Sequence, residues 1–271
     1  MVRDYCDAIN VPDNARGVPT MSSSICAYYV LQNGAEPIMH LTTRDRNRIS
    51  IQSELYGAYA LGIRNILFVA GDHARFGSHP EAKVVYDLNT LEVLSLASKL
   101  REGTDLAGEE LEGIPEFYLG ATFNPNTPSL EDHILQTQKK QDAGAQFFQT
   151  QAIFEPDRLR DFMDQASGLK LKVLAGIIPL RDVEMAVFMN DQIPEITIPE
   201  DIIKRMADVG KGLNEESQIE EMRKEGIKIA LETMDEIRKI NGVNGFHLMG
   251  VGWTESIVEL TRRANLLPRP E

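Results

Sequence analysis

The sequence lacks the features that mark several large classes of protein. Only 2 of its 271 residues are cysteine, Cys6 and Cys26, and their spacing fits neither a disulfide framework nor a zinc motif. Its apolar runs all stop well short of the roughly 20 residues that a membrane-spanning helix needs. The first residues contain no signal-peptide pattern. We therefore expect a cytoplasmic protein with no membrane span and no metal site.

Positive charge is scarce as well. The 28 lysines and arginines are outnumbered by 41 aspartates and glutamates, which leaves a formal net charge of −13 and a pI near 4.9. This balance argues against nucleic acid or an anionic membrane as the main partner, because both repel an acidic surface. Local basic residues remain able to hold a phosphate group. A dinucleotide fingerprint of the GxGxxG type is missing too.

The chain does contain a regular alternation of two patterns. Short apolar runs typical of strands cover residues 7–11, 37–41, 66–70, 117–122, 146–151, 172–177 and 245–251. Helical patterns cover residues 23–32, 46–61, 90–101, 130–142, 156–166, 181–190 and 253–266, and two extra helices are expected at 200–209 and 214–240. Most strand spacings are about 30 residues, the length of one βα unit. The alternation predicts an α/β fold with parallel strands.

Seven strands are one fewer than a βα barrel contains. Either a first strand is missing from this chain, or the sheet is open. We favour the first alternative, because the chain begins almost directly at a strand. The prediction is therefore a (βα)8 TIM barrel without its first strand. It forms a single domain over residues 1–271, with the extra helices around 200–240.

Polar residues gather where the expected strands end. They are Asp13 and Asn14 after the first run, His40 and Thr42 at the second, Asp72 at the third, Asn124 and Asn126 at the fourth, and Thr150 and Gln151 at the fifth. Because the carboxyl ends of parallel strands share one edge, these side chains are expected at one mouth.

Each candidate also has a purely structural explanation. Asp13 fits a turn, His40 fits a hydrogen-bonded core histidine, and Asp72 fits the N-cap of a short helix. Lys139 and Lys140 fit a solvated helix face. Residue types alone therefore do not name a reaction.

Four segments resemble the methylenetetrahydrofolate reductase family. They are DAINVPDN (7–14), EPIMHLTTRDRNRISIQSELYGAYALGIRNILFVAGD (36–72), DLNTLEVL (87–94) and KKQDAGAQFFQTQAIFEPDRL (139–159). The most similar branch is that of acetogens and of bifunctional proteins fused to a homocysteine methyltransferase domain. The resemblance covers nearly the whole chain and weakens after about residue 190.

This resemblance implies an eight-stranded βα barrel that binds FAD at its mouth. Such a protein reduces 5,10-methylenetetrahydrofolate to 5-methyltetrahydrofolate through the flavin, in a ping-pong sequence, within one-carbon metabolism and methionine biosynthesis. The implied partners are the folate substrate and an electron donor, which is NADH, NADPH or a partner redox protein. A homo-oligomer or a hetero-complex is left open.

Particular residues acquire roles from the same resemblance. The implied catalytic residues are Asp72 and Gln151, and both are expected to contact folate. The implied cofactor-binding residues are Asp13, His40, Thr42, Ala70, Gly71, Asp72, Tyr86, Asp87, Asn124, Gln136 and Lys140. Lys140 and Gln136 are expected at the ribose and pyrophosphate of FAD.

Two departures from the family pattern bear on activity. The family's general acid, a glutamate in an E-x-x-PP context on the first strand, has no counterpart here, and the segment GVGW (250–253) also differs. We expect that the recorded start is too late or that the chain is a fragment. The alternative is a short form that is inactive or completed by another chain. Two other functions stay open: a catalytically impaired flavin- or folate-binding subunit, and a pterin-dependent methyltransferase barrel.

Overall fold

The computed structural model describes residues 2–127, 129–193 and 196–269. Its strands are β1 (Ala8–Val11), β2 (Glu36–Thr42), β3 (Asn65–Val69), β4 (Tyr118–Phe123), β5 (Phe147–Ala152), β6 (Val173–Ile177) and β7 (Val243–Leu248). Its α-helices are α1 (Ser23–Gln32), α2 (Arg48–Ala60), α3 (Thr90–Arg101), α4 (Leu130–Asp142), α5 (Pro156–Gln165), α6 (Val183–Gln192), α7 (Glu200–Asp208), α8 (Glu215–Ile237) and α9 (Glu255–Arg263). All the expected strands and helices are confirmed, including the extra helices α7 and α8.

Capping side chains decide where helices begin. The Asn47 side chain accepts the backbone N–H groups of Ile49 and Ser50, so α2 begins at Arg48 rather than at residue 46 as the periodicity predicts. Asn89 forms a capping box with Glu92 at the start of α3. The structure adds three short 3-10 helices that the periodicity does not predict: η1 (Arg3–Tyr5), η2 (Ala15–Gly17) and η3 (Ala74–Phe76).

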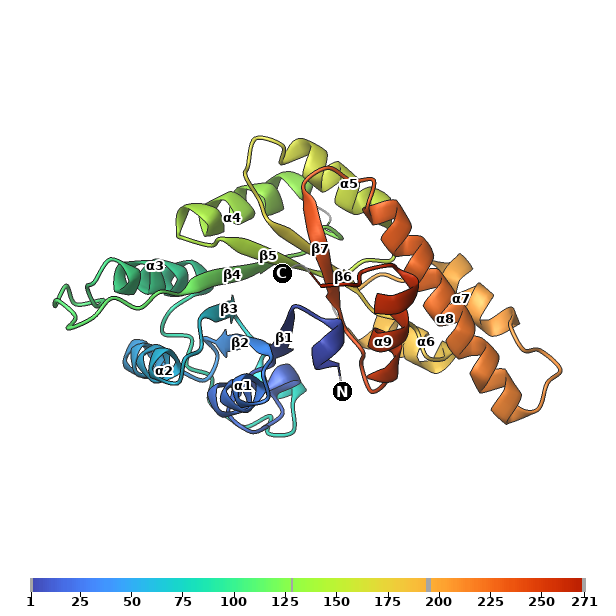
Figure 1. Cartoon of the computed structure of the whole chain (residues 1–271), viewed down its shortest axis with the longest axis horizontal. Coiled ribbons are helices and arrows are strands. Elements are labelled where there is room, and N and C mark those ends of the chain that lie inside the picture. Colours follow the sequence, from blue (N-terminus) through green and yellow to red (C-terminus); the bar gives the residue numbers. More distant parts are fainter. Residues whose placement is uncertain (1, 128, 194–195, 270–271) are drawn as a thin grey trace. The chain divides into compact units, whose positions relative to one another are not determined.

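The strands follow one another in the order β1-β2-β3-β4-β5-β6-β7. The pairs β1–β2, β2–β3, β3–β4 and β6–β7 are all parallel, and His40 of β2 lies opposite Leu67 of β3. Each crossover carries at least one helix, as the parallel connection requires. The predicted α/β class, with the strand order of a βα barrel, is confirmed (Figure 1).

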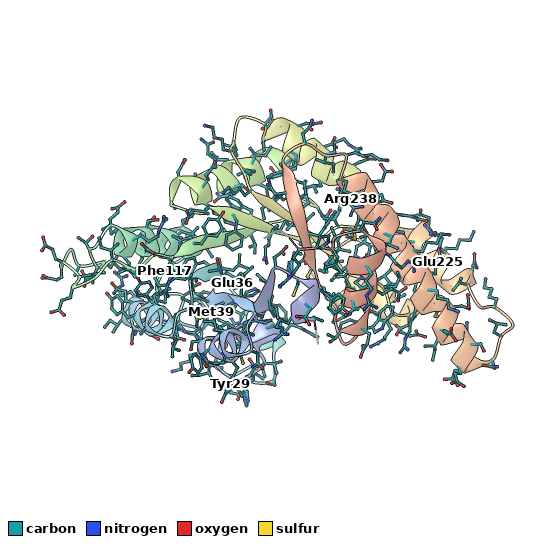
Figure 2. The ribbon with its side chains drawn as sticks, in the orientation of Figure 1. Tyr29, Glu36, Met39, Phe117, Glu225 and Arg238 are labelled. Carbon is teal, nitrogen blue, oxygen red and sulfur yellow. The ribbon has the colours of Figure 1, made fainter. Side chains whose placement is uncertain are left out.

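Contacts divide the chain into two compact units, which are described separately. The N-terminal unit consists of Asp7–Thr122 and Gln136–Phe148, and the C-terminal unit consists of Met1–Cys6, Phe123–Leu135 and Gln149–Glu271. In the N-terminal unit, α1 packs against β1 and β2 and also contacts α2 (Figure 1). Met39 on β2 is buried, whereas Tyr29 points outward from α1 (Figure 2).

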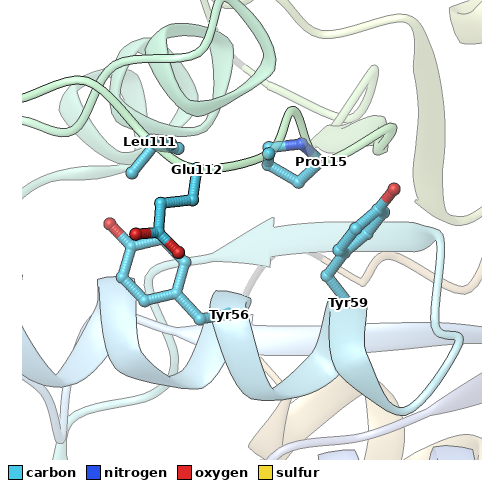
Figure 3. A pocket seen from close by; sticks show the side chains of 6 residues that line it. Tyr56, Tyr59, Leu111, Glu112 and Pro115 are labelled. Atoms are coloured by element: carbon cyan, nitrogen blue, oxygen red, sulfur yellow. The ribbon is translucent and has the colours of Figure 1, made fainter.

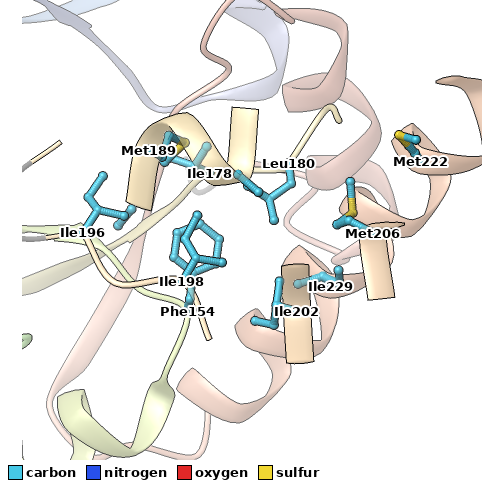
Figure 4. Close-up of a cluster of buried hydrophobic side chains, with 12 residues drawn as sticks. Phe154, Ile178, Leu180, Met189, Ile196, Ile198, Ile202, Met206, Met222 and Ile229 are labelled. Atoms are coloured by element: carbon cyan, nitrogen blue, oxygen red, sulfur yellow. The ribbon is translucent and has the colours of Figure 1, made fainter. Parts of the chain in front are cut away.

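The C-terminal unit has its own apolar core beneath α6, α7 and α8. Ile178, Leu180, Ile198 and Ile202 converge there (Figure 4), and each is less than a tenth exposed. Burying an aliphatic side chain of this size contributes about 1.5–3 kcal/mol. Gly226 lies where α8 crosses the chain at Leu180, and a Cβ there would overlap the Leu180 carbonyl oxygen. The long charged helix α8 is therefore packed closely along one face.

No helix within the described ranges is both long enough and apolar enough to cross a membrane.

Candidate functional site

Three loops of the N-terminal unit are joined by one buried arginine. Arg44 follows β2, and its side chain is only 2% exposed. Its guanidinium donates to the Asn14 carbonyl after β1 at 3.1 Å and to the Asp72 carbonyl after β3 at 2.9 Å. It also forms a two-pronged bond with the Asp45 carboxylate, at 2.6 and 2.7 Å. Arg44 thus fixes the loops that carry most of the predicted site residues.

The same bond sets the charge states of the pair. The hydrogen bond with Asp45 raises the pKa of Arg44 above its ordinary value, and the reciprocal bond lowers the pKa of Asp45. Both groups therefore stay ionised at neutral pH, and the positive charge beside the two carbonyls is permanent.

Asp13 is buried and has donors on both carboxylate oxygens. Thr42 donates to it through its backbone N–H at 2.8 Å and through its hydroxyl at 2.9 Å. Arg46 donates to both oxygens, at 2.6 and 3.2 Å. Asp13 therefore holds Thr42 in place at the end of β2, and direct contact between Asp13 and a cofactor stays a prediction.

Asp72 lies after β3 with its carboxylate exposed. One oxygen accepts the backbone N–H of Arg16 at 3.1 Å. The N-cap explanation for Asp72 is wrong, because the cap of η3 is His73, whose ring nitrogen accepts the Arg75 N–H. Asp72 is instead an exposed carboxylate at the carboxyl end of a strand.

The preceding peptide is tightly packed. Gly71 has φ +80°, and a Cβ there would come within 3.1 Å of the Thr42 methyl group. The Tyr86 hydroxyl donates to the Gly71 carbonyl at 3.0 Å, and burial raises the pKa of Tyr86, so the hydroxyl keeps its proton. The Ala70 carbonyl accepts the Arg44 N–H at 3.1 Å. The turn at Ala70 and Gly71 is thus fixed from two sides.

His40 and Asp87 each have a structural partner. His40 on β2 is half-buried, and its Nε2 lies 2.8 Å from the Asn10 side-chain oxygen on β1. Asp87 accepts the Arg48 side chain at 2.8 and 3.0 Å and the Arg48 backbone N–H at 2.9 Å, which lowers the pKa of Asp87 to about 2. Asp87 therefore ties the loop before α3 to the start of α2.

The two adjacent lysines of α4 differ. Lys139 is exposed, as the solvated-face explanation predicts. Lys140 is half-buried, and its ammonium donates to the Thr122 carbonyl at 2.6 Å, at the end of β4. Gln136, one helical turn earlier, is exposed. Lys140 is therefore held at a strand end, where a positive charge is able to meet an anionic ligand.

The C-terminal unit carries the remaining predicted residues. Asn124 is buried, and its side-chain oxygen accepts the Asn126 N–H at 3.0 Å. On β5, the Gln151 side-chain oxygen accepts the Ala152 N–H at 3.0 Å. Thr150 locks this strand end, because its hydroxyl accepts the Gly176 N–H at 2.8 Å and donates to the Gln151 carbonyl at 2.7 Å.

Sequence reasoning does not single out Arg44, Arg46 or Gln149. The two arginines belong to the run RDRNR (44–48), which in the sequence looks like a solvent-exposed charged segment. In the structure the loops after β1 and β3 pack against the two side chains. Gln149 precedes Gln151 by two residues in the run QFFQTQ (146–151), and this spacing, which puts both on one face of a strand, was the available signal. Within the described residues, no group of three or more His, Cys, Asp or Glu side chains forms a metal site.

A separate hollow of about 270 Å³ lies elsewhere in the N-terminal unit. Tyr56 and Tyr59 of α2 face Leu111, Glu112 and Pro115 across it (Figure 3). None of the predicted site residues lines this hollow, so it belongs to a different part of the surface.

Comparisons with known proteins agree on one family. The family described as Methylenetetrahydrofolate reductase matches residues 1–265. A probable methylenetetrahydrofolate reductase (NADPH) of Caenorhabditis elegans is 26% identical over 186 residues, which cover 68% of this chain and 26% of that protein. The 5,10-methylenetetrahydrofolate reductase of Escherichia coli (strain K12) is 26% identical over 218 residues, which cover 80% of this chain and 66% of that protein. The chain thus spans from about a quarter to about two thirds of these relatives.

A solved structure shares the fold. It is an uncharacterized protein from Clostridium thermocellum described as binding two copies of 5-methyl-5,6,7,8-tetrahydrofolic acid. It matches with a TM-score of 0.65 at 14% identity, over 95% of this chain and 82% of that chain. With the strand order, the carboxylate after β3 and the family match over residues 1–265, the chain belongs to the methylenetetrahydrofolate reductase family.

Proposed function

We propose that this protein reduces 5,10-methylenetetrahydrofolate to 5-methyltetrahydrofolate with bound FAD. The observation that carries the proposal is the exposed Asp72 carboxylate at the carboxyl end of β3, in a chain of this family. The Arg44 guanidinium donates to the Asp72 backbone carbonyl, and the Arg16 backbone N–H donates to one oxygen of the Asp72 carboxylate. Asp72 is therefore presented in a fixed position with acceptor capacity left for a ligand.

The N-terminal unit offers groups that fit a flavin nucleotide. The Lys140 ammonium suits a pyrophosphate, because it is a compact positive charge held beside the end of β4. The Asp72 carboxylate suits the ring N–H of an isoalloxazine, and Thr42, His40, Ala70 and Gly71 form the neighbouring strand ends. When bound, the flavin supplies hydride transfer, and a carboxylate beside it tunes its potential.

We propose that Gln151 contacts the folate. Its side-chain oxygen is engaged with the Ala152 N–H, which orients the amide nitrogen as a hydrogen-bond donor. The Thr150 bonds to the Gly176 N–H and the Gln151 carbonyl keep this strand end rigid. Folate binding by the Clostridium thermocellum protein, which shares the fold, is in line with this role.

The Clostridium thermocellum protein also supports a second candidate function. That protein is described as binding 5-methyl-5,6,7,8-tetrahydrofolic acid, so the alternative is a folate-binding protein without reductase activity, or a pterin-dependent methyltransferase barrel. The deciding experiment records the near-ultraviolet and visible spectrum of the purified protein, then adds 5-methyltetrahydrofolate without oxygen. A flavin spectrum that bleaches supports the reductase. A flavin spectrum that persists supports an impaired flavin-binding subunit, and folate binding without flavin supports the alternative.

A variant tests the role of Asp72. Asp72→Asn keeps the shape and removes the charge, so we expect flavin to stay bound while its rate of bleaching by 5-methyltetrahydrofolate falls at least tenfold. Asp161→Asn, at an exposed position on α5, is the control and should bleach at the wild-type rate. Equal rates in both variants would remove Asp72 from the mechanism.

Other parts of the proposal rest on the family alone. The electron donor is NADH, NADPH or a partner redox protein, and the assembly is a homo-oligomer or a hetero-complex. A single barrel domain and a cytoplasmic location stay predictions. Cofactor contacts by Asp87, Tyr86, Asn124 and Gln136 also stay predictions.

A further inference from the structure

The carboxamide of Gln149 on β5 is buried without a partner. Its side chain is 1% exposed, and within the described part of the chain neither its oxygen nor its nitrogen has a hydrogen bond. A buried polar group without a partner destabilises the folded state, and native proteins keep few of them. Two such atoms on one side chain need a reason beyond packing.

The position of Gln149 supplies that reason. Successive side chains of a strand point to opposite faces, so Gln149 and Gln151 share one face of β5 and lie roughly 7 Å apart along it. Gln151 is the residue proposed above to contact folate. Gln149 therefore lies on the face of β5 that would meet the folate proposed for Gln151, and it lies further inside the protein than Gln151.

We propose that Gln149 binds the pyrimidinone edge of the folate pterin. A carboxamide presents one acceptor and one pair of donors side by side. A pterin presents a ring N–H beside a carbonyl, so the two groups form two hydrogen bonds without any charge. The inference rests on the proposed function, since it takes folate as the ligand. An isoalloxazine carries a similar edge, so the experiment must separate the two rings.

The test compares Gln149→Met with wild type and with Gln165→Met. Methionine keeps the length of the side chain and removes both hydrogen-bonding groups. Gln165 is exposed at the end of α5 in the same unit and controls for the chemical change alone. Isothermal titration calorimetry measures the affinity for 5-methyltetrahydrofolate, the absorbance spectrum measures retained flavin, and thermal unfolding is followed without ligand.

We expect the Kd of Gln149→Met for 5-methyltetrahydrofolate to rise at least tenfold. A tenfold rise corresponds to about 1.4 kcal/mol, which the loss of two hydrogen bonds supplies. Flavin content and the control should not change, and the melting temperature without ligand should stay equal or rise, because a buried unpaired amide has been removed.

Other outcomes overturn the assignment in distinguishable ways. Loss of flavin with unchanged folate affinity would move Gln149 to the isoalloxazine, and unchanged binding with a higher melting temperature would make it an ordinary core residue. A wild-type protein that binds no folate would refute the proposed function as well. If Gln149→Met folds poorly, the side-chain amide resonances of Gln149 in wild-type protein replace it as the readout. They must shift when 5-methyltetrahydrofolate is added, and unmoved resonances refute the proposal.

Discussion

Replacing Arg44 with methionine removes the group that joins the loops after β1, β2 and β3. Methionine retains much of the apolar stem, so the change isolates the guanidinium. The carbonyls of Asn14 and Asp72 each lose a charged donor, and such bonds contribute about 1.5–3 kcal/mol each. The Asp45 side chain is 37% exposed and regains water, so its share is small. We expect the free energy of unfolding to fall by about 3–6 kcal/mol.

Urea titration followed by circular dichroism measures this loss. Arg44→Lys keeps the charge, yet one ammonium cannot match the planar fork that reaches three partners, so an intermediate loss is expected. Arg75→Met is the matched control in the same unit, because Arg75 is exposed and its guanidinium lies 4.5 Å from the Phe76 ring centre. The control should lose under about 1 kcal/mol.

A local readout separates loop release from general destabilisation. The Arg16 N–H is bonded to Asp72, so its hydrogen exchange should accelerate in Arg44→Met before the exchange of the strand interiors does. If Arg44→Met loses no more stability than Arg75→Met, the buried guanidinium does not hold the loops and our account of the site is wrong.

Three further predictions follow from single contacts. Tyr86→Phe removes the hydroxyl bonded to the Gly71 carbonyl and should lower stability by about 1 kcal/mol in the same urea titration; no change would mean that water replaces the bond. Gly176→Ala would place a Cβ within 2.6 Å of a β5 carbonyl oxygen and should cost about 1–3 kcal/mol, whereas Gly168→Ala, which meets nothing within 4 Å, should be neutral. Burial lowers the pKa of His247 from 6.5 to about 4, so the unfolded chain takes up the proton first. The stability that this group contributes is fully present above pH 6.5 and is lost as the pH falls to 4, by about 3 kcal/mol. Wild type should therefore lose more stability over this range than His247→Gln, and parallel pH profiles would contradict the predicted burial.

The charge pairs around the candidate site divide into two kinds. In the pairs of Arg44 with Asp45 and of Arg46 with Asp13, one partner is almost fully buried, Arg44 in the first and Asp13 in the second, and both pairs hold the strand ends. The pair of Arg48 and Asp87 lies at the surface, where solvent and salt weaken it. We therefore assign the shape of the loops after β1 to β3 to the first kind.

Much of the fold was readable from the sequence. The helices over residues 23–32, 90–101 and 130–142 have the predicted bounds, because glycines with positive φ follow all three and a capping box begins the second, and both are local signals. The strands lie within two residues of their predicted starts, since short apolar runs between turn residues are local as well. The same runs placed Asp72 just after a strand and Gln151 near the end of one, where the structure has them.

Only the tertiary structure decided which polar residues hydrogen-bond to the loops of the site and which keep a side chain exposed to a ligand. Asp13 and Asp72 look alike in the sequence, yet Asp13 is saturated by Thr42 and Arg46, whereas Asp72 keeps an exposed carboxylate. Arg44 is buried because two backbone carbonyls, each about 30 residues away in the chain, converge on it. The sequence by itself determined the elements, since helix and strand periods depend on near neighbours. Burial and hydrogen-bond partners depend on residues that only folding brings together, and these decided the site.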